Sequence, residues 1–226
     1  MGKNPIVKQS GNIMQNDYHI NTTTYRIKRL TDILLACIGL IITLPLFPII
    51  AIAIKIESKG PVFFTQLRIG KSTPNHVELF NMIKFRTMIN NAEKSTGATW
   101  AKSTDTRITT VGLFLRKTRL DEIPQFLNVL HGEMSMIGPR PERPGFYKKL
   151  EDNIPFFCER TYGVTPGITG LAQVNQGYDT CTEDVRRKVG FDHSYALALS
   201  TPLSWLKMDI NIIFRTILVM MMGRGQ

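Results

Sequence analysis

Two adjacent acidic residues, Asp121 and Glu122, follow a run of basic residues in the sequence "RKTRLDEIPQF" at positions 116–126. Arg116, Lys117 and Arg119 supply the cations. Such a combination could handle phosphate, because cations bind phosphate oxygens and an ionised carboxylate can attack phosphorus. Ordinary helix-end electrostatics would produce the same pattern. The stretch alone therefore leaves two interpretations, a reaction centre and a helix terminus.

The apolar residues around the acidic pair recur at the spacing of one helix face, which predicts a helix. They are Leu120, Ile123, Leu127 and Leu130. Pro124 is tolerated only in a first turn, so this helix is expected to begin close to Asp121. Asp121 would then cap the helix and Glu122 would interact favourably with its dipole.

The same position also suits catalysis. A carboxylate at a helix start is expected to stay ionised, and the neighbouring amides can bind phosphate oxygens. Asp121 could then attack phosphorus and form an acyl-phosphate, which divides a difficult transfer into two steps. Glu122 and Asp121 could hold Mg²⁺, which would reduce the repulsion between an anionic nucleophile and an anionic diphosphate.

Two further basic motifs carry side chains that suit phosphate. The sequence "GPRPERP" at 138–144 holds Arg140 and Arg143 on a backbone stiffened by prolines. Guanidinium groups bind phosphate through two parallel hydrogen bonds, and a stiff backbone lowers the cost of ordering them. The sequence "KFRTM" at 84–88 adds Lys84 and Arg86. Each motif taken alone is better explained as solvated surface charge.

The sequence "DTRIT" contributes Asp105 and Arg107, at the end of a long polar loop. Long loops in compact domains are more often functional than idle. Asp105 and Arg107 are therefore candidate substrate contacts, although a local ion pair explains them too.

An uncharged segment from Ile33 to Ile54 precedes these motifs. As a helix it is long enough to reach across the hydrocarbon core of a membrane. A core helix of a soluble protein usually shows a polar stripe, and this segment has none. The segment therefore predicts membrane insertion.

Pro45 and Pro48 lie near the middle of the segment, where each removes a helical donor and clashes with the preceding turn. Basic residues flank both ends, with Arg26, Lys28 and Arg29 before the segment and Lys55 and Lys59 after it. Cations favour the cytoplasmic side, so both ends would lie there. Residues 25–60 are thus predicted to form a re-entrant membrane hairpin broken near Pro45. A kinked full crossing stays open, because prolines also occur in spanning helices.

The remaining chain predicts a helix-rich α+β fold. Residues 1–24 are polar and predict a flexible tail. Residues 61–202 are expected to form a small cytosolic catalytic domain with short strands at 62–66 and 77–80, a turn at Gly70, and helical periodicity over 108–130. The sequence "TPGITGLAQV" at 165–174 predicts a turn and a short strand. Residues 203–226 predict an amphipathic helix, which would pack on the core or lie on the bilayer.

Composition restricts the partners. The formal net charge of +10 indicates an anionic partner: nucleic acid, a membrane surface or a phosphorylated substrate. No aromatic-interleaved basic helix or RNA-binding signature supports nucleic acid. Three cysteines without CxxC spacing argue against a disulfide framework and a zinc site.

Together the motifs resemble those of the monotopic polyprenol-phosphate phosphoglycosyl transferases, the bacterial sugar transferases. The resemblance runs from about Tyr25 to Gly225. It rests on "IKIESKGPVFFTQLRIG", "KFRTM", "LRKTRLDEIPQFLNVLHGEMSMIGPRPERP", "VTPGITGLAQVN" and "WLKMDINIIFRTILVMMMGRG". The central motif keeps its order and spacing, which makes it the most specific of the five.

The resemblance implies an enzyme on the cytoplasmic face of the bacterial inner membrane, anchored by a re-entrant helix broken at Pro45. It implies transfer of a phosphosugar from a UDP-sugar to a polyprenol phosphate, with undecaprenyl phosphate as the expected carrier. UMP would be the by-product, Mg²⁺ the cofactor, and the pathway exopolysaccharide, capsule or glycoprotein synthesis. Leu44 stands where family members often have Ser, and Pro48 is an additional breaker.

The resemblance also implies roles for individual residues. Asp121 would be the nucleophile, Glu122 the metal ligand or proton acceptor, Arg116 the support of this pair and Arg140 a phosphate contact. Further candidates are Lys84 and Arg143 for phosphate, and Arg86, Asp105 and Arg107 for the nucleotide-sugar. A homodimer is left open. The competing interpretation is a membrane-anchored protein that binds nucleotide-sugar without turnover.

Overall fold

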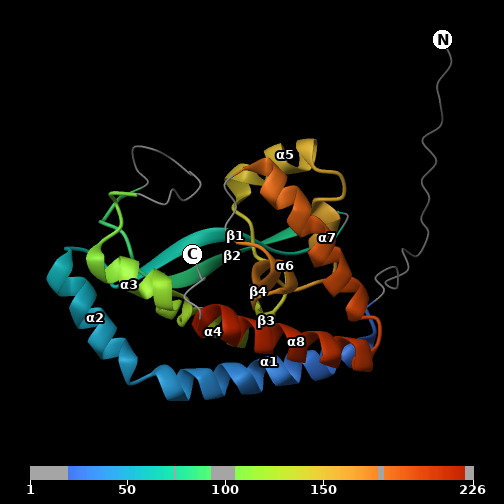
Figure 1. Ribbon diagram of the computed structural model, residues 1–226, viewed down its shortest axis with the longest axis horizontal. Coiled ribbons are helices and arrows are strands. Elements are labelled where there is room, and N and C mark those ends of the chain that lie inside the picture. The colour runs from blue at the N-terminus through green and yellow to red at the C-terminus, as the bar shows by residue number, and fades with distance from the viewer. Residues whose placement is uncertain (1–19, 74, 93–104, 178–180, 222–226) are drawn as a thin grey trace, which may run out of the picture.

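The computed structural model describes residues 20–73, 75–92, 105–177 and 181–221. Helices dominate this part of the chain, and its strands form two small sheets (Figure 1). The elements are α1 (Thr22–Thr43), α2 (Leu46–Glu57), β1 (Phe63–Thr73), β2 (His76–Phe85), α3 (Thr110–Thr118), η1 (Leu120–Glu122), α4 (Gln125–His131), β3 (Ser135–Ile137), α5 (Pro144–Asn153), η2 (Cys158–Thr161), β4 (Gly167–Thr169), α6 (Leu171–Asn175), α7 (Thr182–Ala198) and α8 (Pro202–Met221). The predicted helix-rich α+β class is confirmed. Residues 1–19 of the predicted tail 1–24, and most of the polar loop, 93–104, lie outside the described residues. The last residues of that tail, from Thr22 to Thr24, form the start of α1, so the prediction is wrong there.

The predicted membrane segment forms a bent helix pair. The side chain of Asn21 accepts a hydrogen bond from Thr23 N at 2.8 Å, so α1 begins at Thr22. The chain breaks at Leu44 and Pro45, and the axes of α1 and α2 differ by 62°. Pro48 lies in the first turn of α2, where its missing N–H has no intrahelical acceptor to satisfy. The prediction of a second break at Pro48 is therefore wrong.

The bent pair runs along one side of the domain (Figure 1). Helix α1 contacts α4 and β3, and α2 contacts α3. The buried residues of α1 recur every fourth position, namely Thr24, Lys28, Asp32 and Ala36, while most of its large apolar side chains are exposed. Among the described residues no single helix has the length and apolar character to cross a membrane, whereas α1 and α2 together do.

Strands β1 and β2 form an antiparallel hairpin that is longer than predicted. Gly70 lies inside β1, where the register shifts between Ile69 and Ser72, so the predicted turn at Gly70 is wrong. Phe64 pairs with Lys84, and Arg68 lies on the same face of the hairpin as Lys84. Because β2 contacts η1 and α4, the hairpin brings these side chains to the acidic pair.

The helix predicted over 108–130 is divided into three pieces. Helix α3 ends at Arg119, which adopts a left-handed conformation with φ of 60°. The 3₁₀ turn η1 follows, and α4 begins only at Gln125, after Pro124. Asp121 therefore does not cap α4, and the capping interpretation is wrong. Strands β3 and β4 form a short parallel pair. In the segment 165–174, which predicted a turn and a short strand, only residues 167–169 form a strand, and residues from 171 onward belong to helix α6.

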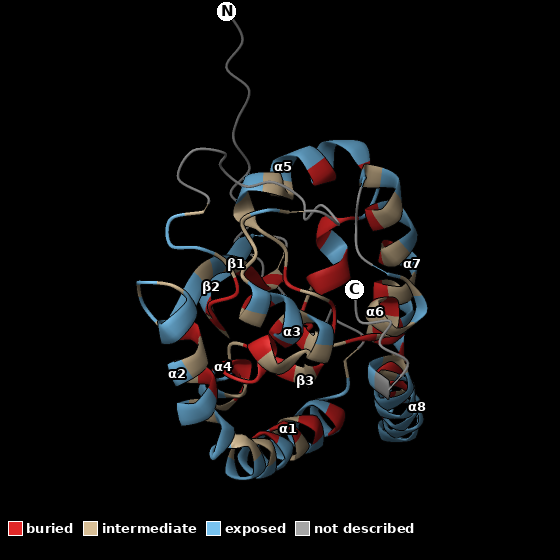
Figure 2. Ribbon diagram, turned by 60° about the vertical axis from the view of Figure 1, so that its left-hand side comes forward, coloured by how far each residue is buried: buried red, intermediate tan, exposed pale blue. Residues whose placement is uncertain are grey.

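The C-terminal helix α8 presents its apolar stripe outward. Leu203, Leu206, Ile210, Ile213 and Ile217 are all exposed, whereas Trp205, Asp209 and Ile212 are buried. The stripe therefore does not pack on the core. Exposed residues cover the outer surfaces of α1, α2 and α8 in Figure 2.

A buried polar network links α8 to α1. Lys28 Nζ lies 3.6 Å from the Asp32 carboxylate and 3.5 Å from that of Asp209. Tyr195 of α7 and Trp205 of α8 both donate hydrogen bonds to Asp209. Buried polar groups of this kind are stable only when satisfied, so the network fixes how the two helices sit on the domain.

Candidate active site

The acidic pair lies at the centre of the molecule in the 3₁₀ turn η1. Asp121 and Glu122 are each 7% exposed. The turn contacts both α3 and β2, so basic residues from these elements reach it. The sequence grouped these residues correctly, although it placed them at a helix start.

Glu122 is surrounded by cations. Its Oε1 lies 2.7 Å from Lys84 Nζ and 3.3 Å from Arg140 Nη2, and its Oε2 lies 3.6 Å from Arg119 Nη1. Burial opposes ionisation of Glu122, but the three cations outweigh it and hold the pKa of Glu122 well below its usual range. Burial also lowers the pKa of Lys84, while Glu122 favours its charged form. Glu122 and Lys84 therefore form a buried ion pair.

Asp121 has the opposite environment. Burial raises its pKa, and the negative charge of Glu122 adds to the rise, although Lys84 and Arg116 act against it. Its Oδ1 atom is buried and has no hydrogen-bond partner among the described residues. Burial thus opposes the ionisation that a helix terminus was expected to favour, and the pKa of Asp121 lies above its usual value. The site therefore provides a buried carboxylate, one oxygen of which has no hydrogen-bond partner among the described residues.

Two predicted arginines border the pair. Arg116, in the last turn of α3, donates from Nε to Thr87 Oγ1 at 2.9 Å and acts on Asp121 through its charge. Arg140 contacts Glu122 directly. Arg143 stands at the N-cap position of α5, close enough to Arg68 to lower the pKa of that guanidinium. Lys84, Arg116 and Arg140 of the predicted phosphate-binding set thus act on the acidic pair, whereas Arg143 lies near Arg68.

Arg68 is a site residue that sequence reasoning missed. Its Nη1 donates to Pro141 O at 2.9 Å and its Nη2 to Gln66 Oε1 at 2.6 Å, while Nε is buried without a partner among the described residues. Burial and the nearby Arg140 lower the pKa of Arg68 to about 9. Its sequence signal was its place in the motif "IKIESKGPVFFTQLRIG", which does not reveal that the 138–144 loop lies against that strand.

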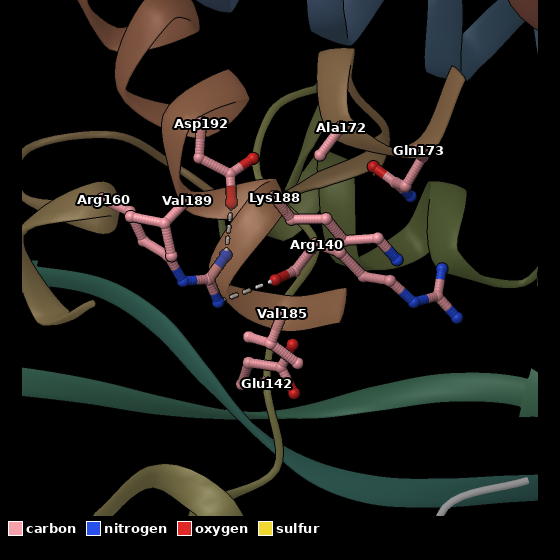
Figure 3. A pocket seen from close by; sticks show the side chains of 9 residues that line it. All are labelled: Arg140, Glu142, Arg160, Ala172, Gln173, Val185, Lys188, Val189 and Asp192. Carbon is pink, nitrogen blue, oxygen red and sulfur yellow. Dashed lines mark hydrogen bonds and ion pairs between the residues drawn. The ribbon is translucent and has the colours of Figure 1, made fainter. Parts of the chain in front are cut away.

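Sequence reasoning also missed an ion pair, Arg160–Asp192, that contacts the backbone of Arg140. Arg160 donates from Nη1 to Asp192 Oδ2 at 2.7 Å and from Nη2 to the Arg140 carbonyl oxygen at 3.2 Å (Figure 3). Both side chains are buried, and the guanidinium of Arg160 also lies over the Phe157 ring. The pair connects α7 and η2 to the backbone of the 138–144 loop.

Three candidates have other partners. Arg86 donates to the carbonyl oxygens of Ser58 and Lys59 at 2.7 and 3.0 Å, so it ties the end of α2 to the end of β2. Asp105 and Arg107 bond to each other at 2.6 and 2.8 Å, and this pairing lowers the pKa of Asp105 to about 2. These contacts are structural, and Asp105 also lies close enough to Arg116 for that charge to lower its pKa.

Magnesium has few protein ligands here. In the part of the chain that the structure describes, no group of three or more His, Cys, Asp or Glu side chains could hold a metal ion. Mg²⁺ is commonly held by one or two carboxylates together with substrate phosphates. The unpartnered Oδ1 of Asp121 and the neighbouring Glu122 fit that second arrangement.

Comparison with known proteins gives a consistent match. A family model described as "Bacterial sugar transferase" matches residues 23–223. The chain is 44% identical over 199 residues to the UDP-N-acetylgalactosamine-undecaprenyl-phosphate N-acetylgalactosaminephosphotransferase of Aeromonas hydrophila, covering 88% of this chain and 44% of the relative. It is 39% identical over 205 residues to the UDP-glucose:undecaprenyl-phosphate glucose-1-phosphate transferase of Klebsiella pneumoniae, covering 89% and 41%. It is 33% identical over 212 residues to the exopolysaccharide production protein ExoY of Sinorhizobium fredii, covering 88% and 87%. The chain thus spans less than half the length of the first two relatives and most of the third.

Proposed function

The chain belongs to the bacterial sugar transferase family, and we propose that it transfers a phosphosugar from a UDP-sugar to a polyprenol phosphate, releasing UMP. Relatives named for this transfer use UDP-N-acetylgalactosamine or UDP-glucose and undecaprenyl phosphate. One observation from this chain supports the proposal most. Asp121 offers a buried carboxylate oxygen without a partner, beside a glutamate whose oxygens already contact cations.

The transfer proceeds in two displacements. In the first, Asp121 attacks the phosphorus that carries the sugar, the bond from this phosphorus to the bridging oxygen breaks, and UMP leaves with that oxygen and the electron pair. In the second, an oxygen of the polyprenol phosphate attacks the same phosphorus. The bond to Asp121 then breaks, which restores the carboxylate and yields the polyprenol-diphosphate-sugar. Burial suits the first step, because a carboxylate that is poorly solvated loses little hydration on attack.

The basic residues neutralise the phosphates. Arg140 and Lys84 contact Glu122 in this structure, and phosphate oxygens offer them a second anion. Arg68 and Arg143 extend the positive charge along the 138–144 loop. Preorganised cations of this kind stabilise the charge that develops on the transferred phosphoryl group.

Magnesium would be held by Asp121 and Glu122 together with substrate phosphate oxygens, and when bound it would supply further charge neutralisation. The described residues provide no complete cage. Metal affinity is therefore expected to depend on the presence of the UDP-sugar.

The enzyme would act at the cytoplasmic face of the bacterial inner membrane. The outward apolar surfaces of α1, α2 and α8 support this location, and the bend at Pro45 supports a re-entrant rather than a spanning arrangement. Single cysteines introduced at Arg26 and Lys55 in a chain whose native cysteines are replaced should react from the same side of a sealed vesicle. Labelling from opposite sides would indicate a full crossing.

Turnover provides the direct test of the activity. Purified protein in lipid nanodiscs should release UMP from a UDP-sugar only when polyprenol phosphate and Mg²⁺ are present, and Asp121→Asn should abolish release. Mass spectrometry of the native chain mixed with UDP-sugar alone should detect a phosphosugar adduct on Asp121. Binding of UDP-sugar with neither adduct nor UMP would instead favour the competing interpretation, a nucleotide-sugar-binding protein.

A further inference from the structure

A small hollow opens beside Arg140, on the side of the 138–144 loop that faces α6 and α7 (Figure 3). Its apolar lining consists of Ala172, Val185 and Val189. In Figure 3 the head groups of Arg140, Lys188 and Gln173 lie on one side of it, while the Arg160–Asp192 pair lies on the other. The lining thus combines apolar side chains with a few polar groups.

The hollow admits one small group. Its volume is about 10 Å³, close to the minimum that a water molecule requires. A whole sugar ring or a nucleobase does not fit into such a space. A single hydroxyl group does, with the rest of the molecule lying across the rim.

Gln173 specifies what kind of group that is. Its Nε2 donates to Ile168 O at 2.9 Å, which fixes the orientation of the amide. Its Oε1 is buried and has no partner among the described residues. A buried acceptor without a donor is costly. The hollow therefore requires a group that donates a hydrogen bond.

Arg140 relates the hollow to the reaction. Its guanidinium lies 3.3 Å from Glu122 Oε1 beside the nucleophile, and the same residue lines the hollow. A group that enters the hollow is thus attached to the phosphoryl group bound by Arg140. Two parts of a UDP-sugar meet that condition, the sugar and the uridine.

The lining favours the sugar. A hexose carries several hydroxyl donors, whereas uracil carries one N–H donor and is usually held by stacking on an aromatic ring. None of the residues that line the hollow is aromatic. We propose that this hollow is the sugar subsite of the donor, in which one sugar hydroxyl donates to Gln173 Oε1 and lies against the apolar lining. The assignment rests on the proposed function, because it takes a UDP-sugar as the substrate.

The subsite makes Gln173 a specificity-determining residue. A site built to bond one hydroxyl rejects an isomer that cannot place a donor there, because the buried acceptor stays unsatisfied. Sugars that differ only in the orientation of that hydroxyl should therefore bind with different affinities.

Binding measurements in an Asp121→Asn background test this assignment without requiring turnover. UDP-glucose, UDP-N-acetylgalactosamine and UDP are titrated by calorimetry against chains with Gln173 intact, Gln173→Ala or Gln173→Met. Both substitutions should weaken the preferred UDP-sugar by about 3- to 10-fold, the usual effect of one hydrogen bond, and leave UDP unchanged. Gln176→Ala is the matched control, since Gln176 Oε1 is also buried without a partner among the described residues but does not line the hollow.

Each other result would overturn the assignment. If the substitutions weakened the binding of UDP as much as that of the UDP-sugar, the hollow would bind the nucleotide and not the sugar. Unchanged affinity for every ligand, with melting temperature lowered in both variants, would mean that Gln173 holds only a structural water. Failure of the proposed function is distinct, because it would appear as absent UMP release in the chain with Asp121 intact.

Discussion

Asp121 and Glu122 are adjacent and equally buried, yet their removal should change stability in opposite directions. Glu122→Gln removes the negative charge that Lys84, Arg119 and Arg140 surround. Asp121→Asn removes a carboxylate whose ionisation the fold opposes. We expect both variants to lose activity, the first to unfold more easily than the native chain and the second less easily.

The size of each effect follows from burial and pairing. Lys84 has a side chain only 15% exposed, and Glu122 is its single carboxylate partner within ion-pair distance among the described residues. Removing one member of a buried pair costs about 3–5 kcal/mol. For a chain of this size the loss corresponds to a fall of roughly 6–20 °C in melting temperature. Asp121→Asn should give a smaller gain, on the order of 1 kcal/mol, as is usual for stabilising single substitutions.

The pH dependence has a definite sign for each variant. The folded-state pKa of Glu122 lies below its usual value of 4.5, so its stabilisation is present above that value and lost as the pH falls through and below it. The penalty of Glu122→Gln should therefore shrink in acid. The folded-state pKa of Asp121 lies above 3.8, so the cost of its charge develops as the pH rises past 3.8. The gain of Asp121→Asn should be present at neutral pH and absent below 3.8.

Thermal unfolding of the detergent-solubilised chains, followed by tryptophan fluorescence in EDTA between pH 3 and 8, measures both effects. EDTA removes divalent cations that would add their own stabilisation. Equal destabilisation by the two substitutions at neutral pH would refute the assignment of opposite environments. A gain from Glu122→Gln would show that the desolvation of the ion pair outweighs its attraction.

Three other substitutions separate structural from catalytic roles. Asp192→Asn should raise KM for the UDP-sugar several-fold with little change in kcat, because it weakens the hold of Arg160 on the Arg140 backbone. An unchanged KM together with a lower melting temperature would show that the Arg160–Asp192 pair is purely structural. Arg86→Met should lower the melting temperature and leave KM unchanged, since Arg86 bonds only to the end of α2 among the described residues, and an increase in KM would return it to the substrate contacts. Gly112→Ala should destabilise the fold strongly in thermal unfolding, because a Cβ there would lie 2.0 Å from the Thr87 carbonyl oxygen; native stability of this variant would contradict the packing of α3 on that strand end.

Much of the site was predictable because its chemistry is local in sequence. Asp121 and Glu122 are neighbours, and the basic motifs carry their cations within a few residues of each other. To bring these groups together, the fold needs only the β1–β2 hairpin and the 138–144 loop to lie beside the acidic pair. The break at Pro45 was predictable for the same reason, since proline acts on its own helix turn.

The wrong predictions concern tertiary context. Pro48 looks like a second breaker until the helix is seen to restart at Leu46, which puts Pro48 in a first turn. The apolar stripe of α8 fits a core as well as it fits a membrane, and periodicity cannot tell which side is solvent. The roles of Arg68 and Arg160 were not predicted, because each contacts a backbone carbonyl oxygen of the distant 138–144 loop.

The break in the predicted helix at 119–124 is what allows the two carboxylates to differ. The left-handed Arg119 ends α3, and Pro124 delays α4, so the acidic residues occupy a 3₁₀ turn in which successive side chains point about 120° apart. Glu122 points to the cations, whereas Asp121 keeps an unpartnered oxygen. If Glu122 were the nucleophile, its attack would first have to break its buried pairing with Lys84. That step would add about 3–5 kcal/mol to the barrier and slow the reaction roughly 10²- to 5 × 10³-fold. Asp121 carries no such cost, and this difference supports the proposal that Asp121, and not Glu122, attacks the phosphorus.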